Sequence, residues 1–296
     1  MKINRKLMSA LCIAAISASA MVFTGCGSSK DSSDSDKGTG AIHVVSREDG
    51  SGTREAFSEI TKLLVKNGDK KTDNTIKDAI VQNSTEAVMS TVSTDKDAIG
   101  YISLGSLNDK VKALKLDGVE ATPKNITDGK YALARPFLIV YKGTPDKVTQ
   151  NFLDYLLSDQ GQELVNKNGY IALKGKGKYE AAKLKGHIAV SGSTSVTPLM
   201  EKMVEQYEKM NPDVTIDIQS NGSSAGITDV INGGSNIGMS SRNLKDDEKS
   251  KLKEEKIGID GIAVIVNKEN KLDNITLQQL NDIYSGKIKE WSKLEK

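Results

Sequence analysis

Residues 46–57 of the chain read SREDGSGTREAF and separate two short runs of different periodicity. The run before them, residues 41–45, alternates between apolar and other side chains as a strand does. The run that follows, residues 56–64, has apolar side chains at helical spacing. The pattern predicts a strand, a Gly/Ser turn and a helix.

This turn has the composition of an anion-binding site. Gly50 and Gly52 allow a sharp turn and a close approach of the backbone to a ligand. Ser51 and Thr53 place hydroxyl and N–H groups at the positive end of the helix dipole. The alternative is that Asp49, Ser51 or Thr53 only caps the helix.

Three more segments of the same kind follow along the chain. A predicted strand at 187–191 leads into GSTSVTPL, and one at 214–218 leads into NGSSAG. A short strand in residues 237–242 ends in SSR. Ligands of open α/β sheets bind beyond the carboxyl ends of the strands, so we expect these turns to form one site.

The repeated strand, turn and helix predict an α/β fold with largely parallel sheets and helices on both faces. Further helices are predicted at 84–92, with Ser84 or Thr85 as the cap, at 147–157 and 159–168, and at 276–284, with Thr276 as the cap. Further strands are predicted at 97–103, 137–141 and 258–266. Residues 68–74 are predicted to be a polar loop, and residues 174–185 an exposed connection. About 255 residues follow the amino-terminal segments, which favours two domains.

The amino terminus has the pattern of a secretory signal peptide in residues 1–25, with Lys and Arg followed by an apolar stretch. Phe23-Thr24-Gly25-Cys26 resembles the lipobox of bacterial lipoproteins, which implies lipidation of Cys26. The alternative is a cysteine that happens to lie near an ordinary cleavage site. Residues 26–40 are polar and are predicted to be a flexible tether.

Composition excludes several classes of function. The net charge is +2 and falls to about −1 without the signal peptide, which does not suggest nucleic-acid binding. The chain has no nucleotide-binding P-loop and no metal-ligand spacing, so we expect no cofactor and no metal. His43 and His187 each begin a predicted strand, away from the turns. The groups left to bind a ligand at the turns are neutral hydrogen-bond donors and Arg47. Such groups suit reversible capture of a small tetrahedral oxyanion.

Six runs of the sequence carry a family resemblance: VVSREDGSGTREAF, VSGSTSVTPL, NGSSAGI, GMSSRNL, DGIAVIVN and IYSGKIKEW. Together they resemble the phosphate-binding lipoprotein of the bacterial ABC phosphate importer. The resemblance implies a two-lobe periplasmic-binding-protein fold with a ligand cleft between the lobes. It also implies a monomer, anchored by lipid to the outer face of the cell membrane, whose partners are inorganic phosphate and the membrane permease subunits.

The order of these runs differs from that of the family, in which GSTSV comes first and IYSGKIKEW leads into the strand before REDGSGTR. The resemblance therefore implies a circularly permuted chain, which close surface termini allow. The alternative is a fragment of a tandem or misassembled gene. The family's crossovers fall near Arg135 and Val266, which implies one continuous lobe, 136–266, and one discontinuous lobe, 41–135 plus 267–296.

The resemblance assigns phosphate binding to these residues: Thr194, Ser195, Ser223, Ser241, Arg47, Ser51, Gly52 and Thr53. The family's best-known members have a carboxylate in place of Ser241, which accepts the proton of hydrogen phosphate and so rejects sulfate. Asp49 and Asp260 are candidates for that acceptor, with pairing to Arg47 as the alternative for Asp49. Arg242 is either a second cationic donor or a solvated surface residue.

The leading interpretation is a binding protein and not an enzyme. A receptor for another tetrahedral oxyanion, such as sulfate or molybdate, is the nearest alternative. A serine-based phosphatase would need a base or a metal beside Ser51, Ser195 or Ser223. A lipoprotein that has lost ligand binding is the remaining possibility.

Overall fold

The computed structural model of the 296-residue chain describes residues 40–67 and 70–294. The predicted signal peptide, Cys26 and all of the predicted tether except Gly40 lie outside the described residues. No helix in the described ranges is long and apolar enough to cross a membrane.

The Gly/Ser stretch forms the strand, turn and helix that its periodicity predicts. Strand β1 (His43–Arg47) ends at the turn, and helix α1 (Gly52–Ile60) follows it. Gly50 has φ +88°, a conformation that favours glycine. Ser51 is the N-cap, and its Oγ accepts a hydrogen bond from the backbone N–H of Arg54.

The remaining helices of the described chain are α2 (Thr85–Thr94), α3 (Pro123–Thr127), α4 (Lys147–Leu157), α5 (Asp159–Lys167), α6 (Thr197–Met210), α7 (Ser223–Asn232), α8 (Asp246–Lys249) and α9 (Leu277–Tyr284). The strands are β2 (Leu64–Asn67), β3 (Lys70–Asp73), β4 (Ile80–Gln82), β5 (Ala98–Ser103), β6 (Lys112–Ala113), β7 (Lys115–Leu116), β8 (Ala134–Tyr141), β9 (Gly186–Gly192), β10 (Val214–Ser220), β11 (Ile237–Ser240), β12 (Lys253–Val266) and β13 (Asn274–Ile275). The long predicted helices and strands are therefore confirmed. Ser84 caps α2 and Thr276 caps α9 through side-chain oxygens, as their positions predict.

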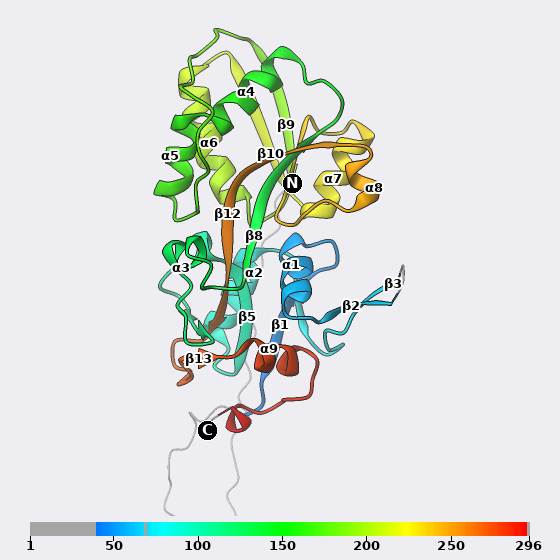
Figure 1. Ribbon diagram of the computed structural model, residues 1–296, viewed down its shortest axis with the longest axis vertical. Coiled ribbons are helices and arrows are strands. Elements are labelled where there is room, and N and C mark those ends of the chain that lie inside the picture. Colours follow the sequence, from blue (N-terminus) through cyan, green and yellow to red (C-terminus); the bar gives the residue numbers. More distant parts are fainter. Residues whose placement is uncertain (1–39, 68–69, 295–296) are drawn as a thin grey trace, which may run out of the picture. The chain divides into compact units, whose positions relative to one another are not determined.

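The main sheet has the order β10-β9-β11-β8-β12-β5-β1-β4. Its flanks are parallel, because β10 and β11 pair with β9, and β4 and β5 pair with β1. Its centre is antiparallel: β8 pairs with both β11 and β12, and β12 pairs with β5. The prediction of largely parallel sheets thus holds for the flanks and not for the centre, where β8 and β12 run as two long neighbouring strands (Figure 1).

Each flank has its own hydrophobic core, and we use these cores to define two lobes. The first lobe is built around Phe57, Tyr101 and Tyr284, with the rings of Phe57 and Tyr101 stacked 4.0 Å apart. The second lobe is built around Phe152 and Tyr207, whose ring centroids are 4.9 Å apart. The two lobes therefore bury separate sets of aromatic side chains.

Helices cover both faces of the sheet in the first lobe. Along β1, Val44 packs in the core with Phe57, whereas Val45 packs on the other face with Val88 of α2. Successive side chains of a strand point to opposite faces, so each face needs its own helical cover. The same alternation runs along residues 262–266 of β12, which pair with β5 in this lobe. The lobe limit near Val266 stays a prediction. Along β12 the side chains change core between Ile257 and Ile259, and the pairing partner changes from β8 to β5 after Gly261.

The two ends of the described chain meet in the first lobe. The backbone N–H of Ile42 donates to Lys289 O at 2.7 Å, and that of Trp291 donates to Gly40 O at 2.9 Å. Ala41 also forms an isolated antiparallel bridge with Glu290. The C-terminal helix α9 contributes Tyr284, whose hydroxyl donates to Val45 O of β1 at 3.1 Å. This lobe is therefore assembled from both ends of the described chain.

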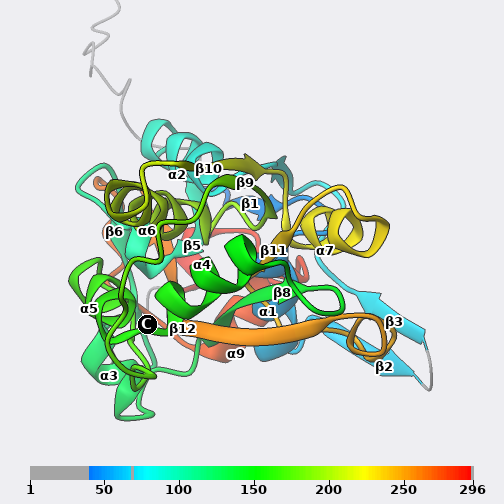
Figure 2. The ribbon, with the colours of Figure 1, turned by 90° about the horizontal axis from the view of Figure 1, so that it is seen from above.

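Several parts of the fold were not expected from the sequence, among them helix α3, the β2–β3 hairpin and the start of β12. Residues 64–67 and 70–73 form an antiparallel hairpin, β2–β3, where a polar loop was predicted from residue 68 on. This hairpin projects from the first lobe in both views (Figures 1 and 2). Strand β12 begins at Lys253, five residues before the predicted start, because the charged run KEEK carries no apolar signal. That run pairs with β8, so pairing rather than side-chain burial makes it a strand.

Candidate anion-binding site

The polar turns converge at the carboxyl ends of β1, β9, β10 and β11. Helices α1 and α7 begin there, and the turn before α6 lies beside them. The backbone N–H groups of a first helical turn have no intrahelical acceptor, so such an arrangement favours an anion. The site lies between the lobes, since α1 belongs to the first and α6 and α7 to the second.

One half of the site is a group of four bonded hydroxyls from both lobes. Thr53 Oγ1 lies 2.8 Å from Ser195 Oγ. Thr85 Oγ1 lies 3.1 Å from the same Ser195 oxygen and 3.4 Å from Thr194 Oγ1. All four side chains are buried. Each hydroxyl can donate or accept, so the group can turn its protons toward an anion.

The other half is centred on Ser241. Ser193 Oγ donates to Ser241 Oγ at 2.9 Å, and the backbone N–H of Ser241 donates to Ser223 Oγ at 3.2 Å. Gly52 of the first lobe lies against this pair, because a Cβ there would be 2.7 Å from Ser241 Oγ and still closer to Ser223 Oγ. Glycine at this position therefore lets the N-terminus of α1 approach the serines of the other lobe.

Arg47 brings the positive charge. It is 2% exposed, and its Nη2 donates to Thr194 Oγ1 at 3.0 Å across the lobes. The same guanidinium makes two 2.8 Å bonds to the carboxylate of Glu48. The Tyr101 hydroxyl accepts from the backbone N–H of Arg47 at 3.2 Å, and burial raises the pKa of Tyr101 so that its hydroxyl stays neutral. Arg47 is thus held at the end of β1 by Glu48, and its Nη2 also reaches the hydroxyl of Thr194.

Two predicted residues have a role that differs from the expected one. Ser51 is buried, but its Oγ is engaged in capping α1. Asp49 has a side chain that is 96% exposed, and it pairs with Arg54 at 2.8 Å. The alternative expected for Asp49, pairing with Arg47, is wrong, because Glu48 holds that position. Glu48 directly follows Arg47 at the end of β1 and reaches its guanidinium, whereas Asp49 lies in the turn.

The other candidate proton acceptor, Asp260, is buried in the central sheet. It accepts from Arg135 Nη2 at 2.9 Å and from Ser103 Oγ at 3.0 Å. Its carboxylate is therefore committed to a buried ion pair within the sheet.

Arg242 is neither a solvated surface residue nor a donor left open to a ligand. It is 2% exposed, and its Nη1 and Nη2 bond Glu248 at 2.7 and 2.8 Å. Burial alone would lower the pKa of Arg242, but the carboxylates of Glu248 and Glu55 raise it. The guanidinium stays charged and is already neutralised by protein groups.

Thr85 and Ser193 were missed as site residues. The sequence marks Ser84 and Thr85 as alternative caps for α2, and Ser84 takes that role, which leaves the Thr85 hydroxyl for the site. Ser193 lies within the predicted turn GSTSV and supports Ser241. Ser193 contacts Ser241, 48 residues away in the sequence, and Thr85 contacts Ser195, 110 residues away. Contacts over such separations give no local signal in the sequence.

The surroundings fit an anion and not a metal. The described residues contain no group of three or more His, Cys, Asp or Glu side chains placed to hold a metal ion. A cavity of about 200 Å³ adjoins the site and is lined by Gly50, Ser51, Arg54, Glu55 and Lys245, among others. Larger cavities, of about 330 and 380 Å³, lie on the second lobe beside α4 and include none of the bonded hydroxyls.

Comparisons with known proteins identify the family of the chain. The family model described as a PBP superfamily domain matches residues 29–160 and 177–295. The phosphate-binding protein PstS 2 of Streptococcus pneumoniae TIGR4 is 48% identical over 291 residues, which covers 98% of this chain and 100% of that protein. PstS 2 of Streptococcus agalactiae serotype V is 49% identical over 278 residues, 93% of this chain and 94% of that protein.

A solved structure extends the likeness to three dimensions. The phosphate-binding protein of a phosphate ABC transporter from Streptococcus pneumoniae TIGR4 superposes with a TM-score of 0.70 and 50% sequence identity. The match covers 86% of this chain and 100% of that one. The chain belongs to the PBP superfamily and, within it, to the family of the PstS phosphate-binding proteins.

Proposed function

We propose that this protein captures inorganic phosphate between its two lobes and delivers it to an ABC-type importer. The observation that carries the proposal is the group of buried hydroxyls and Arg47 at converging helix N-termini, contributed by both lobes. The streptococcal relatives named as phosphate-binding proteins match over nearly the full length of both chains. Binding here exchanges hydroxyl-to-hydroxyl bonds for hydroxyl-to-anion bonds, which are charge-assisted and stronger.

In this proposal the phosphate ligands are Thr194, Ser195, Ser223, Ser241, Arg47, Gly52, Thr53 and the N-terminal turn at Ser51. Arg47 supplies the fork that fits two oxygens of one tetrahedral anion. Gly52 and Thr53 supply backbone N–H groups of the first turn of α1, where the dipole is positive. We add Thr85, whose hydroxyl bonds to Ser195.

The chemistry of the site favours binding over hydrolysis. Both histidines of the chain lie at strand starts and bond to aspartates, His43 to Asp95 and His187 to Asp217, each at 2.8 Å. The carboxylates at the first turn, Glu48, Asp49 and Glu55, each lie beside an arginine. A serine nucleophile would need a free base to accept its proton, so these contacts support a binding protein.

We further propose that Cys26 carries a lipid anchor, that residues 1–25 are removed, and that the protein acts as a monomer on the outer face of the cell membrane beside its permease. The support is the Phe23-Thr24-Gly25-Cys26 run and the polar segment behind it. In cells, replacing Cys26 with Ser should move the protein from the membrane fraction to the soluble fraction. Full retention in the membrane would contradict the anchor.

The permuted chain order is also a proposal. It is supported by the pairing of Gly40 and Ile42 with Lys289 and Trp291, which places the two ends side by side. The full-length alignment with the streptococcal proteins supports an order shared with relatives and not a single misassembled gene. A chain that joins residue 294 to residue 40 by a short linker and opens in the exposed connection near Lys183 should fold and bind phosphate like the parent. Loss of folding in that chain would argue against the permutation.

A second candidate ligand follows from Ser241. A carboxylate at this position would reject an anion that has no proton to donate, such as sulfate. Ser241 is neutral, so we expect the site to tolerate sulfate. Calorimetric titration of residues 27–296 with phosphate, arsenate, sulfate and molybdate tests both candidates. We expect phosphate and arsenate to bind most tightly. Preference for sulfate or molybdate would replace phosphate as the ligand, and no binding of any of the four would refute an oxyanion receptor.

A further inference from the structure

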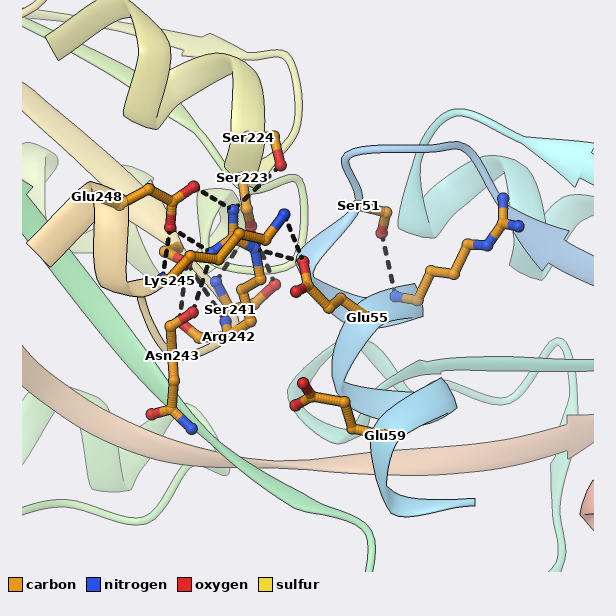
Figure 3. Close-up of polar contacts among 12 residues, drawn as sticks. Ser51, Glu55, Glu59, Ser223, Ser224, Ser241, Arg242, Asn243, Lys245 and Glu248 are labelled. Carbon is orange, nitrogen blue, oxygen red and sulfur yellow. Dashed lines mark hydrogen bonds and ion pairs between the residues drawn. The ribbon is translucent and has the colours of Figure 1, made fainter. Parts of the chain in front are cut away.

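Beside the anion site, Arg242 forms a second set of contacts between the lobes (Figure 3). Its Nε lies 2.9 Å from Glu55 Oε2 of helix α1. Lys245 Nζ lies 3.4 Å from the same carboxylate oxygen. We call Glu55, Arg242, Lys245 and Glu248 the interlobe clamp. Because Arg242 Nε makes no well-aligned hydrogen bond, charge rather than bond geometry dominates its contact with Glu55.

The clamp is adjacent in sequence to the anion-binding turns. Arg242 follows Ser241, and its Nη2 donates to the hydroxyl of Ser224, which follows Ser223. Glu55 lies two residues after Thr53 in the first turn of α1. Arg242 therefore connects three of the turns that are proposed to hold the anion, although Arg242 itself is not a proposed ligand of the anion. Breaking these contacts would therefore shift the hydroxyls of Ser241, Ser223 and Thr53, because each lies close in sequence to a residue that the clamp holds.

The two carboxylates around Arg242 differ in how they are attached. Glu248 belongs to the same lobe as Arg242 and lies six residues after it, in helix α8. Glu55 belongs to the other lobe, whose core contains Phe57 of the same helix. If the lobes part, Arg242 keeps its bonds to Glu248, so the buried guanidinium is not left unpaired. The contact with Glu55 is therefore the half of the clamp that can open at low cost.

We infer that Glu55 is a positioning residue that holds the lobes together around the bound anion and slows its release. This inference rests on the proposed phosphate binding and deepens it. Opening the lobes to release the anion breaks the Glu55 contacts, whereas the first encounter of the anion with the open site does not involve them. Glu55 should therefore act on the dissociation rate and leave the association rate nearly unchanged.

The test compares Glu55→Gln with Glu59→Gln in the parent background. Glutamine keeps the shape and removes the charge that dominates the contact. Glu59 lies one turn further along α1 (Figure 3). Its side chain is 41% exposed, and it shares Lys71 with Glu55, at 3.6 and 3.7 Å. Rapid-mixing measurements with inorganic phosphate should show dissociation about five- to thirty-fold faster for Glu55→Gln, and unchanged for Glu59→Gln.

Two further readouts separate the clamp from a general effect on the fold. Unfolding without phosphate should have nearly the same midpoint for Glu55→Gln as for the parent, because Arg242 keeps its bonds to Glu248 in the variant. Added salt should speed phosphate release from the parent more than from Glu55→Gln, because the variant has lost the screened contact. The shorter Glu55→Asp should give an intermediate dissociation rate, and it serves as the test if the glutamine variant does not fold.

Equal dissociation rates for the parent, Glu55→Gln and Glu55→Asp would overturn the inference. A loss confined to the association rate would overturn it as well. If the parent itself does not bind phosphate, the proposed function fails first, and that result is recognised before any variant is compared.

Discussion

Arg47 and Arg242 are two arginines, one from each lobe, with the same burial and different partners. Each is 2% exposed and each bonds a carboxylate of its own lobe, Glu48 or Glu248. Across the lobes Arg47 reaches a neutral hydroxyl of Thr194, whereas Arg242 reaches the carboxylate of Glu55. A guanidinium gains a stronger, charge-assisted hydrogen bond when it exchanges a hydroxyl for an incoming anion, but it gains none when it exchanges a carboxylate for that anion. The partner across the cleft therefore supports the two proposed roles, Arg47 as a ligand and Arg242 as part of the clamp.

The largest effect should come from removing the ligand arginine. Replacing Arg47 with Ala should weaken phosphate binding by about 2–5 kcal/mol, on the order of thirty-fold or more in Kd, because a desolvated oxyanion loses two charge-assisted bonds. Calorimetry measures this directly. Arg47→Lys is the matched control: it keeps the charge without the fork, so it should recover only part of the loss. Unchanged affinity in Arg47→Ala would remove the distinction between the two arginines.

A smaller loss should follow from forcing the two halves of the site apart. Gly52→Ala adds a Cβ within 2.7 Å of Ser241 Oγ, so α1 or the serines must shift. We expect about 1–3 kcal/mol of lost binding or stability, which is the usual range for overpacking. Phosphate titration and urea unfolding should be run on the same sample. Gly234→Ala is the control, since its Cβ would have no neighbour closer than 3.6 Å; equal behaviour of the two variants would refute the close approach.

Removing one neutral donor should have a milder effect than removing the charged one. Thr85→Val deletes the hydroxyl that bonds to Ser195 and keeps the size of the side chain. We expect about 0.5–1.5 kcal/mol of lost phosphate affinity, the usual net value of a neutral hydrogen bond. Thr94→Val, at the exposed end of the same helix, should bind like the parent. If the two valine variants bind alike, Thr85 is not part of the site.

The smallest effect should be a dependence of stability on pH at the clamp. Burial opposes ionisation of Glu248, but the bonds from Arg242 and the backbone N–H of Lys245 outweigh it and lower its pKa. Because the folded pKa lies below that of the unfolded chain, the stabilisation is complete above the usual range of a glutamate and is lost as pH falls through the lower, folded value. Near neutral pH it should amount to about 0.5–1 kcal/mol.

Urea unfolding without phosphate at pH 7 and at pH 4 measures this dependence. The stability lost between the two pH values should be smaller in Glu248→Gln than in the parent, since that variant cannot titrate at the clamp. Glu201→Gln, on the exposed face of α6, should lose as much as the parent. An equal loss in all three proteins would show that Glu248 and Arg242 do not form a stabilising pair.

Local signals in the chain were sufficient for the elements and for the turns that carry the site. Helical periodicity and side-chain caps place α4 and α9 at the predicted residues, because both depend on neighbours within one or two turns. The Gly/Ser turns are recognised for a similar reason, since short hydroxyl residues at a helix start are a local pattern. The individual assignments of Ser195 and Ser223 come from the family resemblance. The family resemblance agrees with the comparisons and covers nearly the whole chain.

The pairing of charges across the fold was open until the tertiary structure placed the lobes. Glu48 and Asp49 are both close to Arg47 in sequence, and only the path of the turn leaves Asp49 exposed and gives the guanidinium to Glu48. Ser84 and Thr85 are equivalent as caps, and the choice between them follows from Ser195, 110 residues further along the chain. Arg242 is a clamp because Glu55 lies opposite it, on a helix of the other lobe. Such partners have no fixed spacing in sequence, so periodicity and composition carry no signal for them, whereas burial in a low-dielectric interface makes each one necessary.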